Sequence, residues 1–272
     1  MLEQRDAWGE RLPRRIGLWS AVAVLVGSTI GSGIFRVPAG VADRLQEPGP
    51  VLLAWVVGGI IALFGALTLA ELAGALPRSG GVFAYILEAF GPLPAFLFGW
   101  SELTVIRASA LGAIATIFAE YLGHFIPLQP MEVRWIAAAA VVTVGVLNYV
   151  GVNRAAILMN LATVTKYLAL AALVLLAFAV GRGSASHFSP AWGSGLNLSL
   201  MATALIAIMW TYDGWADLSF MGGEVKNPGR TLPLALILGT SGILVIYLLL
   251  NLAYIYLVPL GEMARSPLIA AT

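Results

Sequence analysis

Long apolar runs separated by short polar segments dominate the chain. Each run is long enough to supply the roughly 20 residues that a helix needs to cross a bilayer, so the pattern predicts seven membrane-spanning helices. A polar-edged connector is expected after the second run, over 77–92, and a Gly/Ser-rich loop after the fifth, over 182–196. The expected spans are 16–42, 51–76, 93–121, 133–152, 156–181, 197–222 and 232–258. This predicts an all-α integral membrane protein.

The first run contains a stretch that does not suit a continuous helix. The segment LVGSTIGSGIFRVP, residues 25–38, places Gly27, Gly31 and Gly33 among Ser and Thr. Glycine costs about 1 kcal/mol relative to alanine inside a helix, so this spacing predicts an open backbone near Gly31–Gly33. Open backbone in a bilayer needs polar partners, and the helix N-terminus that follows suits an anion such as a carboxylate. Gly27 and Gly31 also form a GxxxG pattern, so close packing of two helices is the alternative.

The sixth run is interrupted by WTYDGW, residues 210–215. An acidic residue inside a span is a functional-site hypothesis by default. The alternative is that Asp213 and Asp217 lie near the membrane interface and only cap a helix end. The two interruptions begin two successive blocks of five runs, a pattern typical of transporters that bind substrate near the bilayer midplane.

Composition supports the membrane assignment and excludes several other classes. The chain is 60% hydrophobic and 11% charged, with a mean hydropathy of +0.90. A net charge of +1 gives no indication of nucleic-acid binding. The absence of cysteine excludes a disulfide framework and a disulfide-linked partner subunit. His124 and His187 are too few and too scattered for a metal cluster, so neither a metal nor a cofactor is expected.

Basic residues predict the orientation of the spans. The first apolar run is too long for a signal peptide and lacks a cleavage site, so we expect it to be retained behind a cytoplasmic tail, 1–15. With the N-terminus inside, eight basic residues lie on inner segments and four on outer ones, which favours this orientation. The inner set is Arg5, Arg11, Arg14, Arg15, Arg78, Arg154, Lys226 and Arg230, and the outer set is Arg44, Arg134, Arg182 and Arg265.

Four segments carry a resemblance to a known family. They are GSTIGSGIF at 27–35, PRSGGVFAYILEAFG at 77–91, WTYDGW at 210–215 and GEVKNPGRTLP at 223–233. In this order they resemble the amino acid–polyamine–organocation superfamily, most closely its L-type amino acid transporter branch. The resemblance implies the LeuT-like fold, in which two inverted five-helix repeats usually give twelve spans. We therefore expect residues 16–181 to form the first repeat, 182–258 to start the second and 259–272 to start an outer loop, in a truncated member.

The resemblance also implies a substrate site between the two interruptions. The amino acid carboxylate would meet the first interruption, and the substrate ammonium would meet carbonyl groups freed at the second. Trp210 would act as an aromatic gate, unless it is an ordinary bulky residue of the span. The expected substrate-binding residues are Ser28, Thr29, Ile30, Gly31, Ser32, Gly33, Trp210, Thr211, Tyr212, Asp213 and Gly214, with Trp215 as a further pocket or gate residue.

Three other charged positions lie inside spans. Relatives that do not use sodium carry a lysine at the position of Lys166, which would replace the ion through protonation or as a fixed ammonium. A lysine that extends to the inner interface is the alternative. Glu102 and Arg107 are five residues apart, so on a regular helix they do not share a face and need not pair. The resemblance makes Arg107 a possible pocket or gate residue that would favour acidic or polar side chains, although we prefer a structural role for it. A candidate set of inner-gate charges comprises Glu71, Arg78, Glu88, Glu224, Lys226 and Arg230.

These features predict a plasma-membrane permease for neutral L-amino acids, working by exchange or proton-coupled symport, and not an enzyme. The alternatives are a cationic amino acid or polyamine carrier, favoured by Asp213, and a fragment that does not transport alone. A retinal protein would need a lysine in 232–258, which has none. An intramembrane hydrolase is excluded because no histidine lies deep in a span and Asp213 and Asp217 are expected four apart on one helix.

Overall fold

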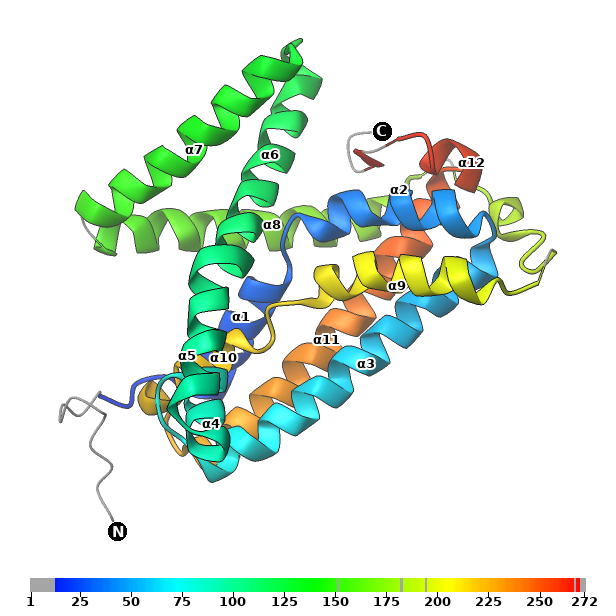
Figure 1. Cartoon of the computed structure of the whole chain (residues 1–272). Helices are drawn as coiled ribbons and strands as arrows, with labels where there is room; N and C mark the ends of the chain where they lie inside the picture. Colours follow the sequence, from blue (N-terminus) through cyan, green and yellow to red (C-terminus); the bar gives the residue numbers. More distant parts are fainter. Residues whose placement is uncertain (1–12, 151, 182, 194, 267, 270–272) are drawn as a thin grey trace.

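The computed structural model describes residues 13–150, 152–181, 183–193, 195–266 and 268–269, with residues 150, 152–160 and 162 described by their backbone alone. This part of the chain is helical and contains no strand, although an isolated β-bridge pairs Ile16 with Val225. Figure 1 shows the arrangement. The longer helices are α1 (Leu18–Thr29), α2 (Gly33–Leu45), α3 (Pro48–Ala75), α4 (Gly81–Phe90), α5 (Pro92–Ser101), α6 (Arg107–Phe125), α7 (Pro130–Val150), α8 (Val152–Ala179), α9 (Leu198–Tyr212) and α11 (Pro228–Leu257). The shorter ones are the π-turn η1 (Glu102–Ile106), η2 (Ala185–Phe188), α10 (Asp217–Phe220), η3 (Gly222–Glu224) and α12 (Leu260–Met263).

Four helical segments of the described residues are long and apolar enough to cross a membrane. They are α3, the continuous segment Pro92–Phe125, α7 over Pro130–Tyr149, and α11. Helices α1 and α2 together form a fifth, bent by 49° at a break. The fifth expected span corresponds to α8, within which Thr163–Ala179 is a shorter apolar helix, and the sixth to α9 with α10. The count of seven spans remains a prediction.

The helix bounds differ from the expected ones for identifiable reasons. Helices α3, α7 and α11 start earlier than expected, at Pro48, Pro130 and Pro228. Proline favours the first helical position, where its fixed φ suits the helix and no N–H is needed. The expected connector 77–92 contains a helix, α4, with apolar residues. It is bounded by Gly80, whose backbone is left-handed, and by Gly91, whose φ is +85°.

The core is built on α3 and α11, which run side by side diagonally in Figure 1, with α1 packed on α11. Glycines allow this close approach: a Cβ at Gly239 would lie 2.6 Å from Leu25 of α1. The aromatic rings of Trp55, Tyr212 and Tyr247 meet at centroid separations of 5.0–6.0 Å, and all three side chains are buried. Segments from both interrupted regions therefore share one core.

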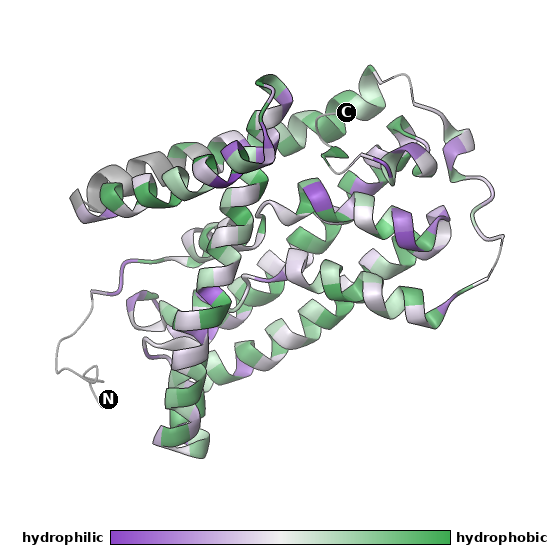
Figure 2. Cartoon of the chain, turned by 45° about the horizontal axis from the view of Figure 1, so that its top comes forward, coloured by the Kyte–Doolittle hydropathy of each residue, from purple (hydrophilic) through white to green (hydrophobic). Residues whose placement is uncertain are grey.

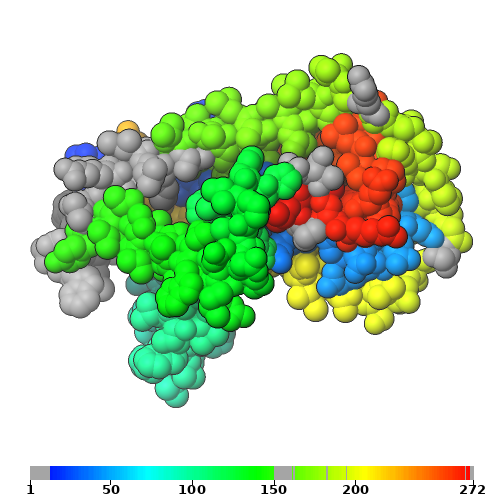
Figure 3. All heavy atoms as spheres, turned by 90° about the horizontal axis from the view of Figure 1, so that it is seen from above, coloured from blue at the N-terminus to red at the C-terminus, as the bar shows by residue number. Residues whose placement is uncertain are grey.

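Helix α7 and the adjoining part of α6 project from this core, as Figures 1 and 3 show from two directions. They pack on each other through the small residues Ala115, Ala119 and Ala137. Large apolar side chains on α7 are exposed, including Trp135 at 70%. Hydrophobic colours dominate the ribbon in Figure 2. Such surface suits lipid or further helices rather than water.

The segment before α1 pairs with the loop after α10. The N–H groups of Arg15 and Ile16 donate to the carbonyl oxygen of Glu224 at 2.9 and 3.0 Å, and the N–H of Lys226 donates to that of Ile16 at 2.8 Å. The expected cytoplasmic tail spans 1–15, and its residues 1–12 lie outside the described part. The pairing brings together two segments that the orientation prediction assigns to one side of the membrane.

Candidate functional site

Two interruptions of helical structure lie in direct contact. The first separates α1, which ends at Thr29, from α2, which begins at Gly33. The second separates α9, which ends at Tyr212, from α10, which begins at Asp217. Both interruptions lie where the sequence predicts them. The hydroxyl of Ser28 donates to the carbonyl oxygen of Gly214 at 2.9 Å and also lies 3.0 Å from that of Leu25.

Glycine is required at both interruptions by the closeness of the two backbones. Gly214 has φ +117°, and a Cβ there would lie 2.8 Å from both the carbonyl oxygen of Ser28 and the Cα of Thr29. A Cβ at Gly33 would lie 2.9 Å from Oγ1 of Thr211. The glycines therefore let the two interruptions approach each other, in addition to opening the helices.

Some polar groups at the interruptions have partners and others do not. The hydroxyl of Tyr247, a fully buried residue of α11, lies 3.2 Å from the carbonyl oxygen of Thr29 and 3.1 Å from that of Thr211. The hydroxyls of Thr29 and Ser32 are buried and have no hydrogen-bond partner among the described residues. Leaving such a group unpaired costs about 1–3 kcal/mol, and neither residue lines the cavities described below.

The other expected site residues range from fully buried in the core to exposed. Ile30 is fully buried and Gly31 is half-buried. Tyr212 points into the core, where its hydroxyl donates to the carbonyl oxygen of Trp55 at 3.2 Å. Trp215 packs beside Gly65 of α3 and lines neither of the cavities described below. Asp213 is exposed.

The expectation that Asp213 and Asp217 lie on one helix is wrong. Asp213 follows the end of α9, and Asp217 starts α10 after a turn through Gly214. The N–H of Asp217 donates to the carbonyl oxygen of Gly214 at 3.1 Å. The left-handed conformation of Gly214 turns the chain, so the two carboxylates are not related by helical spacing.

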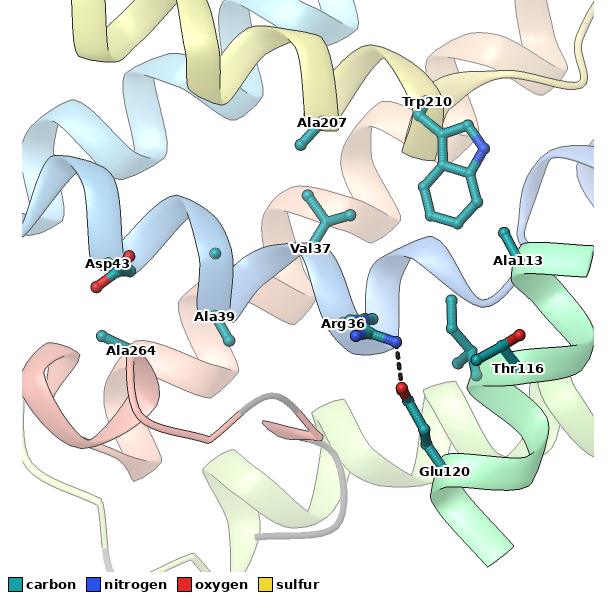
Figure 4. A pocket seen from close by; sticks show the side chains of 12 residues that line it. Arg36, Val37, Ala39, Asp43, Ala113, Thr116, Glu120, Ala207, Trp210 and Ala264 are labelled. Atoms are coloured by element: carbon teal, nitrogen blue, oxygen red, sulfur yellow. Dashed lines mark hydrogen bonds and ion pairs between the residues drawn. The ribbon is translucent and has the colours of Figure 1, made fainter. Parts of the chain in front are cut away.

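A cavity of about 660 Å³, here called the Trp210 cavity, lies between α2, α6 and α9. Figure 4 shows the indole of Trp210 above Val37 and Ala113. An ion pair between Arg36 of α2 and Glu120 of α6 lies on its wall. Its lining residues are Arg36, Val37, Ala39, Gly40, Asp43, Ala113, Thr116, Ile117, Glu120, Ala207, Trp210 and Ala264.

Neither Arg36 nor Tyr247 was identified from the sequence. Arg36 follows the first interruption by only three residues, and a charge at that place inside a span was an available signal. Tyr247 lies in a continuous apolar run, where an aromatic residue ordinarily indicates packing. Its contact with both interruptions depends on how α11 crosses them.

A second cavity of about 470 Å³, the Arg107 cavity, lies between α4, α5, η1, α6 and α10. Arg107 donates through Nε to Glu102 at 2.8 Å and through Nη2 to Asp217 at 2.6 Å, with Nη1 3.4 Å from the second Asp217 oxygen. The expectation that Glu102 and Arg107 need not pair is wrong. Glu102 starts the π-turn η1 and Arg107 directly follows it, and the i→i+5 hydrogen bond from the Arg107 N–H to the Glu102 carbonyl places the two residues on one face. The lining residues are Phe83, Phe98, Gly99, Glu102, Arg107, Asp217 and Phe220.

The two cavities lie in series along the same helical segments. In the continuous segment Pro92–Phe125, Arg107 lines one cavity and Ala113 the other, about 9 Å apart at helical rise. In the sixth expected span, Trp210 lines one cavity and Asp217 the other, on opposite sides of the second interruption. The contact between the two interruptions thus lies between two open spaces.

Lys166 of α8 lies against the end of α1. Its ammonium donates to the carbonyl oxygen of Gly27 at 3.0 Å and also contacts that of Ile30. These carbonyls lie at the last turn of α1, where the negative end of the helix dipole favours a cation. The side chain therefore joins the first interruption instead of extending to an interface.

Of the expected inner-gate charges, Arg78 and Glu88 form an ion pair at 2.5 Å within the described residues. It is exposed, so its contribution to stability is small. Close by, Tyr85 of α4 is buried against α10. Burial raises the pKa of Tyr85 above its ordinary value, and a side-chain hydrogen bond with Ser219 partly offsets this. Within the described residues, no group of histidine and acidic side chains could hold a metal ion.

Comparison with known proteins gives one family match that covers nearly the whole chain. The family model described as "Amino acid permease" matches residues 16–271. Among curated proteins, the b(0,+)-type amino acid transporter 1 of Oryctolagus cuniculus is 34% identical over 267 residues, which make up 96% of this chain and 55% of the relative. The cystine/glutamate transporter of Homo sapiens is 34% identical over 96% of this chain and 54% of the relative.

A bacterial relative matches over a similar range. The serine/threonine exchanger SteT of Bacillus subtilis is 30% identical over 261 residues, which make up 94% of this chain and 59% of the relative. The chain thus spans little more than half the length of the curated relatives it matches. The names of these relatives describe transporters and an exchanger of different amino acids.

Proposed function

Because the chain belongs to the amino acid permease family, we propose that it forms the substrate-binding part of a carrier for neutral L-amino acids, working by exchange or proton-coupled symport. The observation that carries this proposal is the contact between the two interruptions, with two buried and unpartnered hydroxyls beside it. The names of the relatives describe the transport or exchange of amino acids, but of amino acids with different side chains. Similarity to them alone therefore does not identify the substrate.

The substrate carboxylate would bind at the first interruption. There the hydroxyls of Thr29 and Ser32 lack partners, and α2 begins at Gly33 with the positive end of its dipole. The N–H groups around Gly31 would supply further donors. A neutral carrier needs no other charged group for this part of the substrate.

The substrate ammonium would bind at the second interruption. The carbonyls at the end of α9, around Trp210 and Thr211, lie at the negative end of that helix. Trp210 lines the adjoining cavity and would cover the bound substrate. Gly214 would keep the second interruption against Ser28. The two ends of a zwitterion would thus be matched by two helix ends of opposite polarity.

Lys166 would couple transport to the state of the first interruption. Its ammonium contacts the last turn of α1, the segment that would move when the substrate site opens to the other side. Protonation of Lys166, or its fixed charge in an exchanger, would take the place of a bound sodium ion.

The chain is a multi-pass membrane protein, and we further propose the plasma membrane with the N-terminus inside. Residues 16–181 would form the first five-helix repeat and 182–258 the start of an inverted second one. No disulfide-linked subunit is proposed, since the chain has no cysteine. The proposed activity is transport without catalysis.

A cationic amino acid or polyamine carrier is the alternative that one observation favours. Asp213 is exposed directly after α9, where it would attract a second positive charge on the substrate. A fragment that does not transport alone is the other alternative, because the relatives are nearly twice as long.

The test is uptake and counterflow of labelled amino acids in proteoliposomes. We would compare this chain with a version extended through the remaining spans, each with Ser32→Trp as a variant that fills the first interruption. Transport of neutral amino acids that Ser32→Trp abolishes supports the proposal, and transport by the extended version alone identifies the chain as a fragment of the carrier. Uptake of lysine or putrescine without neutral amino acids would replace the proposed substrate.

A further inference from the structure

Arg107 is the only basic residue among the described residues that line the Arg107 cavity, and it is not free. Two carboxylates hold its guanidinium: Glu102 through Nε and Asp217 through both terminal nitrogens. The Glu102 and Asp217 side chains are 22% and 29% exposed, so these contacts are partly shielded from solvent. Charge-assisted contacts of this forked kind are among the stronger hydrogen bonds of proteins.

The charge of this group is negative. Two carboxylates against one guanidinium leave a net charge of −1 on the wall of the cavity. Asp213 adds another acid within electrostatic reach of all three side chains. The remaining lining residues are three phenylalanines and a glycine, which bring no compensating charge. In this partly enclosed apolar space, the negative charge is screened less than on an open surface.

The group also lies beside the proposed substrate path. Asp217 bonds to the carbonyl of Gly214, the residue that contacts Ser28 at the crossing of the two interruptions. The cavity volume of about 470 Å³ falls in the range of roughly 300–1,000 Å³ that is usual for small-molecule sites. A substrate that leaves the crossing on this side would pass Asp217 first.

We propose that Glu102 and Asp217 determine specificity by occupying Arg107, so that the carrier excludes amino acids with an acidic side chain and accepts those without one. This inference rests on the proposed transport function and deepens it. An arginine in such a cavity would otherwise bind a side-chain carboxylate in the same forked geometry. Here Asp217 already occupies that position from within the chain. The π-turn is part of the arrangement because it brings Glu102 onto the same face as Arg107.

The decisive experiment is competition against uptake of a labelled neutral amino acid by the full chain in proteoliposomes. Unlabelled glutamate is expected to compete poorly with wild type. Asp217→Asn should strengthen competition by about tenfold or more, because a charge-assisted hydrogen bond contributes at least about that factor. The double variant Glu102→Gln/Asp217→Asn should strengthen it further.

Three further variants separate release of the arginine from a general change of charge. Asp217→Glu keeps the carboxylate and should keep glutamate excluded. Glu262→Gln removes an acid at an exposed position of α12, no residue of which lines the cavity, and should leave competition unchanged. Adding Arg107→Gln to the double variant should abolish the gain.

Failure of this inference can be told from failure of the proposed function. Equal competition by glutamate in wild type and the double variant, with neutral uptake intact, would overturn the specificity role of Glu102 and Asp217. The proposed transport function would be unaffected. Absence of neutral uptake by both the wild-type chain and its extended version would instead refute the transport proposal. Thermal stabilisation of the detergent-purified variants by glutamate gives a second readout: the inference requires stabilisation of the double variant and not of wild type.

Discussion

Lys166 donates a hydrogen bond to the carbonyl oxygen of Gly27 at 3.0 Å, across 139 positions of sequence. The contact joins α8 to the last turn of α1, next to the first interruption. A lysine at this depth is costly unless its charge has partners, and here backbone carbonyls provide them. The end of α1 and the proposed coupling residue therefore form one structural unit.

Replacing this lysine tests its proposed role. Lys166→Met should lower initial uptake by about tenfold or more, the equivalent of at least ~1.4 kcal/mol, and should remove its dependence on a pH gradient. Thermal stability should change little, because the lost hydrogen bonds are offset by removal of a partly buried charge. Leu168→Met, at an exposed position of the same helix, is the matched control. Uptake with unchanged pH dependence in Lys166→Met would contradict the coupling role.

The crossing of the interruptions should not tolerate a side chain at Gly214. Gly214→Ala adds a Cβ 2.8 Å from the backbone of Ser28 and Thr29, at a φ of +117°. Strain of this kind costs about 1–3 kcal/mol, so we expect a lower thermal midpoint in detergent together with loss of uptake. Gly242→Ala in α11 is the control, because a Cβ there meets no atom within 4 Å. Equal thermal midpoints and equal uptake in the two variants would show that a side chain fits at Gly214, where the two interruptions meet.

The hydroxyl of Tyr247 should contribute to stability, while a neighbouring hydroxyl should not. Tyr247→Phe removes the donor shared by the carbonyls of Thr29 and Thr211 and should destabilise the protein by about 1–3 kcal/mol. Tyr254→Phe, seven residues later in the same helix, removes a buried hydroxyl that has no partner within the described residues. It should cost nothing or stabilise slightly. Thermal unfolding of the two purified variants is the measurement, and a larger loss in Tyr254→Phe would reverse the assignment.

The sequence identified the two interruptions because glycine and polar residues inside apolar runs act locally. The structure has helix ends at Thr29 and Tyr212, next to those residues. The π-turn at Glu102–Ile106 could not be predicted in this way. Its residues, ELTVI, are compatible with a regular helix, and one extra residue per turn leaves no mark on hydrophobic periodicity. The pairing of Glu102 with Arg107 was missed for that reason.

Contacts between distant segments form the other group that sequence alone did not identify. The ion pair of Arg36 with Glu120 joins positions 84 apart, and that of Arg107 with Asp217 joins positions 110 apart. Spacing rules apply within a helix and contain no information about which helices meet. The specificity proposed above rests on such a contact, which the family resemblance did not reveal.

The π-turn itself leads to a test of chain register. Deleting Val105, an exposed residue within it, should convert the turn to a regular helix and leave Glu102 and Arg107 four apart, still on one face. The variant should therefore express and purify as a monodisperse protein. Deleting Ile61 from the regular helix α3 should prevent folding, because the residues that follow would rotate by about 100°. Gel filtration and thermal unfolding compare the two, and an unfolded Val105 deletion would argue against this view of the π-turn.

Where Tyr247 meets the two interruptions, hydrogen-bond acceptors outnumber the hydrogens of its hydroxyl. Its hydroxyl carries one hydrogen but faces two carbonyl oxygens, those of Thr29 and Thr211, one from each interrupted segment. At any moment one of these acceptors lacks its donor. An ammonium group brings three hydrogens to the same place and could supply both acceptors at once. Tyr247 thus holds the two interrupted segments together with one shared hydrogen, and the ammonium of the proposed substrate would add donors for both carbonyls.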